Sequence, residues 1–181
     1  MRSDISEILI DERAIASRLD ELAIQLSADY RNLETTVIPL LNGSYVFAAD
    51  LLRRIPLPFV VAGWQMASYR GETSTGSMEF LQPPPDDLEG RHILILDDIL
   101  DTGLTLRSVK ETLAKVSRPA SIRTCVLLKK NVPRPPGTDA DYVGFEIPDA
   151  FVVGYGLDYN GRFRNFPHIA IPSPSAIEKY R

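Results

Sequence analysis

The residues most able to do chemistry in this 181-residue chain lie together between positions 93 and 105. There an apolar run, Ile-Leu-Ile-Leu, leads into two adjacent aspartates, a third aspartate and a Thr-Gly-x-Thr turn: Asp97, Asp98, Asp101, Thr102, Gly103, Leu104 and Thr105. Backbone N–H groups and hydroxyls at the start of a helix bind phosphate readily. Carboxylates beside a phosphate would repel it, so we expect sugar hydroxyls or a metal ion between the two. The spacing therefore predicts a site for a phosphorylated sugar.

A plainer interpretation of these residues is a solvated acidic strand end, and two aspartates alone would favour it. Thr102 and Thr105 could equally be capping residues of the helix that follows. The turn and the helix beside the aspartates favour the phosphate and sugar site, and capping is compatible with phosphate binding.

The elements around this stretch predict a parallel α/β sheet. Residues 92–96 are apolar enough for a strand buried on both faces, residues 104–116 have a helical pattern, and residues 122–128 read as a second apolar strand. Strand, helix and strand in this order indicate a right-handed crossover. Open α/β sheets bind ligands at the carboxyl ends of their strands, which places the aspartates at the binding edge.

The other segments are assigned from local patterns. We expect helices at 11–27 and 45–54, strands at 36–41, 59–66, 142–145 and 151–155, and an irregular end over 162–171. Pro39 argues against a fully paired central strand because proline cannot donate to a ladder. Ser44 is a plausible N-cap for the second helix. The hydroxyl-rich segment 69–77 predicts a surface loop that could act as a lid.

Composition narrows the class of protein. The length suits a single domain over residues 1–181. The net charge of −4 argues against binding nucleic acid through a basic surface. Cys125 is the sole cysteine, which excludes an internal disulfide and a four-cysteine zinc site, and its apolar neighbours predict an inert core position. Without a signal peptide or a membrane-length apolar run, we expect a cytoplasmic protein that does not bind membranes.

Two segments carry a resemblance to a known family. The stretch Ile-Leu-Asp-Asp-Ile-Leu-Asp-Thr-Gly-Leu-Thr resembles the signature of the type I phosphoribosyltransferases, which bind 5-phosphoribosyl diphosphate. Residues 143–160, Val-Gly-Phe-Glu-Ile-Pro-Asp-Ala-Phe-Val-Val-Gly-Tyr-Gly-Leu-Asp-Tyr-Asn, resemble the hypoxanthine-guanine phosphoribosyltransferases. The resemblance covers residues 35–172. The first segment is shared by enzymes for several bases, whereas the second is far more specific to 6-oxopurines.

The resemblance implies a role for each part of the first segment. Asp97 and Asp98 would contact the ribose hydroxyls and, with Asp158, a Mg²⁺ ion that substrate oxygens hold for the most part. The peptide N–H groups of residues 101–105 would hold the 5′-phosphate. Asp101 would take the proton that the purine loses at N7, and such help is typically worth about 10²–10⁴ in rate. A second sugar contact or a capping contact is the alternative for Asp101.

The resemblance also implies how the base is recognised. Lys130 would donate to the purine O6, although lysines at strand ends are usually solvated charges. Such a donor would discriminate against adenine, which would leave it unpaired. Phe151 would stack on the purine and the Val152 backbone would bind its remaining edge, although core packing is the usual fate of both. Asp158 would line the same site, although it could simply cap a turn.

Pyrophosphate would bind to a turn made of Asn42, Gly43 and Ser44, and to Arg164, for which a surface charge is the alternative. This turn departs from the family, because its mammalian members have lysine at the position of Asn42. The backbone of the turn can still bind phosphate, but one charged contact is missing, so pyrophosphate affinity or an intersubunit contact could differ. In the family the preceding peptide bond, Leu41–Asn42 here, is often cis.

Together these features predict a type I phosphoribosyltransferase-like α/β fold, with a central parallel sheet flanked by helices and a small C-terminal hood that contributes the base pocket. Ser68 and Tyr69 would belong to a mobile loop that closes over the site and excludes water. The expected activity is purine salvage: 5-phosphoribosyl diphosphate and hypoxanthine or guanine give IMP or GMP and pyrophosphate, with Mg²⁺. A homodimer or homotetramer is implied by the resemblance alone.

Three rival hypotheses stay open at this point. The preferred base could be xanthine or a wider set of 6-oxopurines, because Lys130 and Phe151 do not separate these bases. The chain could be a non-enzymatic nucleotide-sensing regulator on the same fold, which Asp101 and the hydroxyl-rich loop disfavour. A phosphoacceptor receiver domain also has acids at strand ends, but it predicts neither the Thr-Gly-x-Thr turn nor the segment 151–160.

Overall fold

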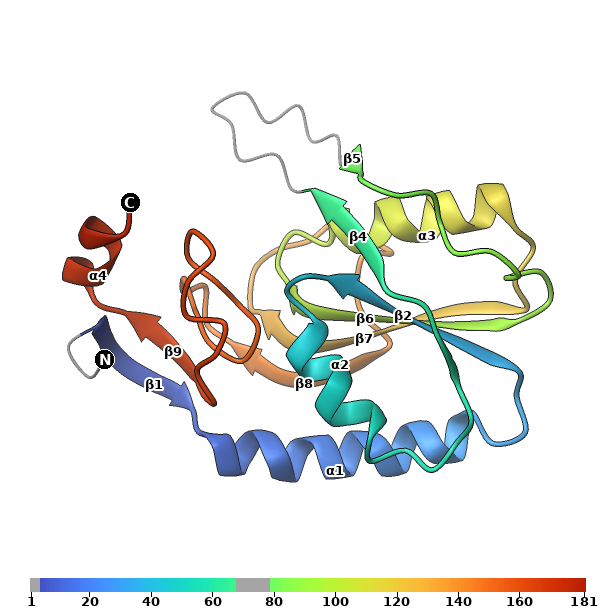
Figure 1. The fold of residues 1–181 in the computed structure, drawn as a ribbon, viewed down its shortest axis with the longest axis horizontal. Helices are drawn as coiled ribbons and strands as arrows, with labels where there is room; N and C mark the ends of the chain where they lie inside the picture. Colours follow the sequence, from blue (N-terminus) through green and yellow to red (C-terminus); the bar gives the residue numbers. More distant parts are fainter. Residues whose placement is uncertain (1–3, 68–78) are drawn as a thin grey trace.

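A computed structural model describes residues 4–67 and 79–181 of the chain (Figure 1). Its elements follow one another as β1 (Ile5–Ile10), α1 (Glu12–Asp29), β2 (Thr35–Leu41), α2 (Tyr45–Leu52), β3 (Val60–Val61), β4 (Trp64–Ala67), β5 (Glu79–Phe80), β6 (His92–Leu100), α3 (Leu104–Val116), β7 (Ser121–Lys130), β8 (Tyr142–Ile147), β9 (Ile169–Pro172) and α4 (Pro174–Lys179). The predicted lid residues, Ser68 and Tyr69, lie outside the described residues.

One sheet organises most of the molecule. Its strands lie in the order β5-β4-β2-β6-β7-β8, with β3 also paired to β2. Strands β2, β6, β7 and β8 run parallel, whereas β5 is antiparallel to β4. Figure 1 shows α3 on one face of the sheet and α1 and α2 on the other. The predicted parallel α/β sheet flanked by helices is confirmed.

The apolar run of β6 is buried on both faces of the sheet. Leu94 and Leu96 belong to a core cluster shared with α1 and α2, whereas Ile93 and Ile95 belong to a second cluster shared with α3. The clusters alternate along the strand because successive side chains point to opposite faces. Cys125 of β7 lies in the first cluster, where burial raises the pKa of its thiol to about 12, so it occupies an inert core position as predicted.

Strand β6 runs through the first two aspartates instead of ending before them. The strand predicted over residues 92–96 continues to Leu100, and β7 continues to Lys130. Asp97 pairs with Val126 in this ladder. Backbone hydrogen bonds set the length of a strand, and they are indifferent to side-chain polarity. Asp97 and Asp98 are therefore held inside a strand, and only Asp101 follows its end.

Strand β2 is paired on both sides, with an interruption at Pro39. Residues 36–37 pair with β3 and residues 40–41 pair with β4, while Pro39 pairs with Leu96 of β6 on the other side. The missing N–H of proline thus coincides with the gap in the ladder, in line with the prediction. The strand predicted over residues 59–66 divides into β3 and β4 at the same gap.

The C-terminal part of the chain forms a small hood beside the main sheet. Strand β9 pairs antiparallel with β1, and α4 follows it, so both ends of the chain contribute to this layer (Figure 1). A small apolar cluster that includes Val153, Phe163 and Ala176 holds the hood together. No helix in the described part of the chain is long and apolar enough to span a membrane.

The strand predicted over residues 151–155 is wrong. Three consecutive residues there, Gly154, Tyr155 and Gly156, have positive φ, which extended strands do not use. The segment keeps only an isolated bridge between Val153 and Ala170. It therefore forms an irregular wall between the main sheet and β9, and β9 begins inside the region that was expected to be irregular throughout.

Candidate functional site

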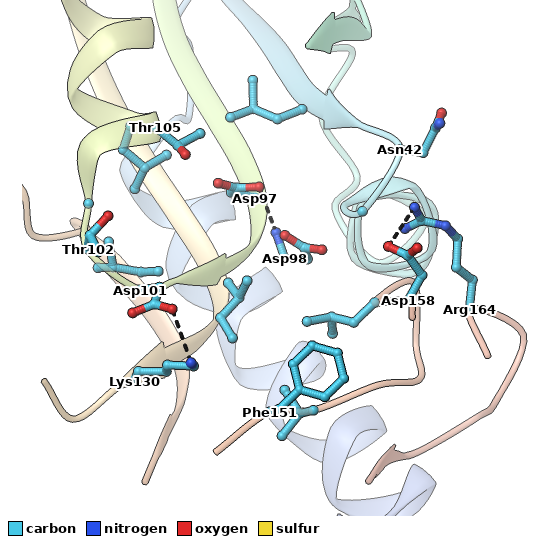
Figure 2. A pocket seen from close by; sticks show the side chains of 18 of the residues that line it. Asn42, Asp97, Asp98, Asp101, Thr102, Thr105, Lys130, Phe151, Asp158 and Arg164 are labelled. Atoms are coloured by element: carbon cyan, nitrogen blue, oxygen red, sulfur yellow. Dashed lines mark hydrogen bonds and ion pairs between the residues drawn. The ribbon is translucent and has the colours of Figure 1, made fainter. Parts of the chain in front are cut away.

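A cavity of about 450 Å³ lies at the carboxyl ends of β2, β6 and β7. Most of the predicted site residues line it: Asn42, Gly43, Asp97, Asp98, Asp101, Thr102, Gly103, Thr105, Lys130, Phe151, Val152, Asp158 and Arg164. Figure 2 shows these side chains arriving from strands and loops far apart in the chain. Two predicted residues, Ser44 and Leu104, do not contribute to the lining.

Asp97 and Asp98 form an adjacent pair of carboxylates beneath the cavity. Asp97 is only 7% exposed, and its Oδ1 accepts a hydrogen bond from the Asp98 N–H at 3.0 Å (Figure 2). Burial raises the pKa of Asp97 well above its usual value, and the charge of Asp98 adds to the rise. Burial also raises the pKa of Asp98. A bound cation or hydroxyl donors would favour the ionised form of both groups.

Lys130 joins two carboxylates beside the cavity. Its Nζ lies 3.0 Å from Oδ2 of Asp101 and 3.0 Å from Oδ1 of Asp149. Burial works to lower the pKa of Lys130, but the hydrogen bonds to the two carboxylates outweigh it and hold this pKa above its ordinary value. The side chain is therefore an ammonium at neutral pH, able to donate but not to accept. It is not the freely solvated lysine of the plainer interpretation.

The turn after β6 presents the N-terminus of α3 to the cavity. The N-cap residue is Gly103 in the left-handed region with φ of 78°, so no side chain caps the helix. Thr102 Oγ1 lies 3.5 Å from the Leu104 N–H, at the outer limit of a hydrogen bond. Capping by Thr102 and Thr105 is therefore weak or absent. The first N–H groups of α3, which have no partner inside the helix, remain suited to an anion.

The turn after β2 approaches the acidic pair closely. A Cβ at Gly43 would lie 1.9 Å from Oδ2 of Asp98, so only glycine fits there. The preceding Leu41–Asn42 peptide bond is cis. Ser44 is fully buried and its Oγ donates to the Leu40 carbonyl at 2.7 Å. The expectation that its side chain caps α2 is therefore wrong. The turn thus presents Asn42 and Gly43 to the cavity and directs the Ser44 hydroxyl into the fold.

Arg164 and Asp158 face each other across the far side of the cavity. Arg164 Nη2 lies 2.8 Å from Oδ1 of Asp158, as Figure 2 shows, and Nη1 donates to the Gly156 carbonyl. The second oxygen of Asp158 accepts from the Gly161 N–H at 2.7 Å, which is the turn-capping contact foreseen as an alternative. The Arg164 guanidinium is thereby held in one orientation, at an edge of the cavity where an anion could bind.

Phe151 offers an aromatic face to the cavity. It is 46% exposed, and its ring meets Tyr159 edge-on with centroids 5.7 Å apart and an interplanar angle of 80°. Phe151 is therefore not packed in the core, which is where such a residue usually lies. Val152 is buried, so what it offers a ligand is its backbone. An exposed ring beside buried backbone groups suits a planar heterocycle.

Sequence reasoning missed several residues that shape this site. Asp149 is the second carboxylate at Lys130, and Arg134 bonds the backbone of both Asp101 and Lys130. The buried Thr138 fills the space beside Gly103. The signal that could have found Asp149 is its position in the sequence, two residues before Phe151. The proline-rich sequence around Arg134 gives no signal of the contacts that Arg134 makes. Those contacts depend on the path that the chain takes between β7 and β8.

Comparisons with known proteins agree with this geometry. The family model of the phosphoribosyl transferase domain matches residues 6–160 of the chain. The chain is 39% identical over 179 residues to a hypoxanthine-guanine phosphoribosyltransferase from Bacillus subtilis (strain 168), covering 98% of this chain and 99% of the relative.

Two solved structures are similar over nearly the whole chain. One is a hypoxanthine phosphoribosyltransferase from Staphylococcus aureus, with a TM-score of 0.90, 38% identity, and coverage of 97% of this chain and 95% of that one. The other is a hypoxanthine phosphoribosyltransferase from Trypanosoma cruzi in complex with the product IMP, with a TM-score of 0.85, 35% identity, and coverage of 95% and 96%.

Proposed function

The chain belongs to the phosphoribosyltransferase family, and from this premise we propose that it is a purine-salvage enzyme. It transfers the phosphoribosyl group of 5-phosphoribosyl diphosphate to hypoxanthine or guanine. The bond from C1′ to the pyrophosphate oxygen breaks, a bond from C1′ to a purine ring nitrogen forms, and the purine loses a proton. The products are IMP or GMP and pyrophosphate.

The observation that carries this proposal is the position of Lys130 beside Asp101 at one cavity. A 6-oxopurine needs a donor at O6 and an acceptor for the proton it loses, and these side chains supply the two. Phe151 gives the base a surface on which to stack, and the Val152 backbone lies beside it. A pyrimidine site would need no proton acceptor placed next to an O6 donor.

Asp101 is the residue we assign to the proton at purine N7. Its carboxylate follows the end of β6, on the side of the cavity where Lys130 lies (Figure 2). Lys130 holds the carboxylate in place through the 3.0 Å contact. A base fixed in this way can act as the C1′ bond forms, without first reorganising.

The sugar and its phosphates would occupy the rest of the cavity. Asp97 and Asp98 would accept hydrogen bonds from the ribose hydroxyls, and the N–H groups of residues 101–105 would hold the 5′-phosphate. Asn42 and Gly43 would hold pyrophosphate through their backbone, and Arg164 lies on the same side of the cavity as Asn42 (Figure 2). Bound in this way, the substrate spans the cavity with C1′ near the base.

The acidic residues fit a Mg²⁺ ion that the substrate brings with it. The described residues contain no cluster of three or more His, Cys, Asp or Glu side chains able to hold a metal by themselves. Mg²⁺ suits such a site because it keeps several waters and binds substrate phosphates with one or two protein carboxylates. Asp97, Asp98 and Asp158 are the carboxylates that would take part. The chemistry that Mg²⁺ supplies when bound is neutralisation of charge on the leaving pyrophosphate.

A panel of bases tests the proposal. Purified protein is mixed with 5-phosphoribosyl diphosphate, Mg²⁺ and one of hypoxanthine, guanine, xanthine, adenine or uracil, and pyrophosphate release is followed. Release with hypoxanthine and guanine, but not with adenine or uracil, is the expected result. A higher rate with xanthine than with hypoxanthine or guanine would make xanthine the preferred base. No release with any base would point to a nucleotide-sensing regulator instead. A parallel series with a chelator tests the need for Mg²⁺.

We further propose that residues 1–181 act as one phosphoribosyltransferase domain, in the cytoplasm and as a homodimer or homotetramer. The family match over residues 6–160 supports the single domain. The polyanionic substrate supports the location, since charged sugar phosphates do not cross membranes unaided. Sedimentation equilibrium of the purified protein would decide the number of subunits.

A further inference from the structure

The connection from β7 to β8, residues 131–141, lies against the turn of residues 101–103 that follows β6, and its contacting side chains do not line the cavity. Its central side chain is that of Arg134, which is only 9% exposed. Arg134 Nη1 donates to the Lys130 carbonyl at 2.7 Å and to the Asp101 carbonyl at 3.2 Å. One donor group therefore joins the two backbone segments that carry Lys130 and Asp101, the proposed O6 donor and the proposed proton acceptor. Arg134 itself does not line the cavity.

A second contact from the same connection lies against Gly103, two residues further along the turn. A Cβ at Gly103 would lie 2.5 Å from the Cβ of Thr138, so the turn is seated directly on this side chain. Thr138 is itself buried, and its Oγ1 donates to the Pro135 carbonyl at 2.7 Å. The connection thus contacts the turn at two points, the Asp101 carbonyl and Gly103.

The contact with the Asp101 carbonyl sets the direction of a phosphate-binding group. In a planar trans peptide the carbonyl and the following N–H point to opposite sides. When Asp101 turns its carbonyl toward Arg134, the Thr102 N–H must point away from Arg134, and Thr102 lines the cavity. Arg134 therefore fixes the direction of the Thr102 N–H, one of the groups proposed to bind the 5′-phosphate, although Arg134 does not line the cavity.

Within the described part of the chain, the Arg134 guanidinium does not have hydrogen-bond partners for all of its N–H groups. Its Nε is buried without a hydrogen-bond partner among the described residues and lies 3.5 Å from Oδ1 of Asp139. The guanidinium thus leaves one of its own donors poorly served while it bonds two carbonyls. Burying an unpaired donor has a free-energy cost, which a surface arginine would avoid.

We propose that Arg134 is a positioning residue that couples the purine-binding and phosphate-binding halves of the site by fixing the Asp101 and Lys130 backbones together. This inference rests on the proposed phosphoribosyltransferase function. It predicts that loss of the Arg134 donors weakens the binding of the phosphoribosyl part of the substrate, although Arg134 touches no substrate.

The test compares Arg134→Met, which keeps the stem and removes the donors, with Arg134→Lys and with Arg107→Met. Arg107 is an exposed arginine of α3 paired with Glu111, and serves as the matched control. In Arg134→Met we expect the KM for 5-phosphoribosyl diphosphate and the Kd for IMP to rise about tenfold or more, the lower end of the effect of a lost buried hydrogen bond to a charged group. Arg134→Lys should show a smaller rise and Arg107→Met no change.

The outcomes separate three explanations. A purely structural role would lower the melting temperature and the active fraction and leave both KM and Kd unchanged; with active-site titration this result would overturn the proposal. If Arg134→Met does not fold, an unchanged KM in Arg134→Lys has the same meaning. If the unmodified protein releases no pyrophosphate with any base, the proposed function fails first, and IMP calorimetry still reports whether Arg134 affects a phosphate site.

Discussion

The Lys130 ammonium lies midway between two carboxylates, 3.0 Å from Asp101 and 3.0 Å from Asp149. An ammonium has three N–H donors. Two are directed at these carboxylates, which leaves one for an acceptor on the base. The two carboxylates therefore orient the third donor as well as holding the charge. Under the proposed function, recognition of O6 and removal of the purine proton would be linked through the single ion pair between Lys130 and Asp101.

Removing the ammonium should impair use of the purine selectively. In Lys130→Ala we expect kcat/KM for hypoxanthine to fall by about 10–100-fold, since a hydrogen bond from a charged donor contributes about 1.5–3 kcal/mol. Lys129→Ala is the matched control, because Lys129 is the adjacent lysine and is paired with Asp139 and Glu146 instead. Steady-state kinetics and purine calorimetry measure both variants. Unaltered purine binding in Lys130→Ala would show that the O6 assignment is wrong.

Replacing the Asp101 carboxylate, the proposed proton acceptor, with its amide should slow turnover and spare binding. Asn at position 101 keeps the shape and can still accept from Lys130, but it cannot take a proton. We expect kcat of Asp101→Asn to fall by about 10²–10⁴-fold, the usual range for general-base catalysis. Binding of 5-phosphoribosyl diphosphate, followed by calorimetry, should persist. A variant that turns over at the normal rate would remove Asp101 from the proton-transfer role.

A methyl group at Gly43 should damage the proposed ribose site by displacing Asp98. The added Cβ would lie 1.9 Å from Oδ2 of Asp98, so this carboxylate must move. We expect Gly43→Ala to weaken affinity for 5-phosphoribosyl diphosphate by about tenfold or more, comparable to the loss of a hydrogen bond to a charged group. If the damage acts through Asp98, adding Gly43→Ala to Asp98→Ala should cost little more than Asp98→Ala alone. Fully additive losses would refute that route.

The buried acid Asp97 should make the ligand-free protein less stable as the pH rises. Its raised pKa means that the folded state keeps a proton that the unfolded chain releases, so stability falls between the unfolded pKa, about 3.9, and the higher folded one. Asp97→Asn removes this penalty and can still accept from the Asp98 N–H. We expect its melting temperature to exceed that of the unmodified protein by a few degrees at pH 7.

This prediction has two controls: the same melting measurement at a lower pH, and the same substitution at an exposed aspartate. Well below the unfolded pKa of about 3.9, where the acid is protonated in both states, the advantage of Asp97→Asn should disappear. The exposed Asp86→Asn should show no advantage at either pH. Both melting series are run without Mg²⁺ or substrate, since either ligand would favour the ionised carboxylate. An equal gain at both values of pH would indicate a packing effect.

Local patterns in the sequence were sufficient for the fold class and for the residues that gather at the cavity. The apolar run before Asp97 and the helix that begins at Leu104 are encoded by neighbouring residues, so their types and order could be predicted. Strand ends could not, because the ladder that pairs Asp97 with Val126 depends on backbone hydrogen bonds and ignores side-chain polarity. The apolar segment 151–155 failed as a strand for the opposite reason, since its backbone takes positive φ despite suitable side chains.

What the sequence determined by itself is therefore the list of chemical groups and the order of the elements that carry them. Only the tertiary structure decided which groups meet. The parallel crossovers bring the ends of β6 and β7 together, so Asp101 reaches Lys130, and Arg134 reaches the Asp101 carbonyl from 33 positions away in the chain. The direction of the Ser44 hydroxyl and the second carboxylate at Lys130 were decided in the same way. Such contacts depend on the packing of distant segments, which no local pattern of residues records.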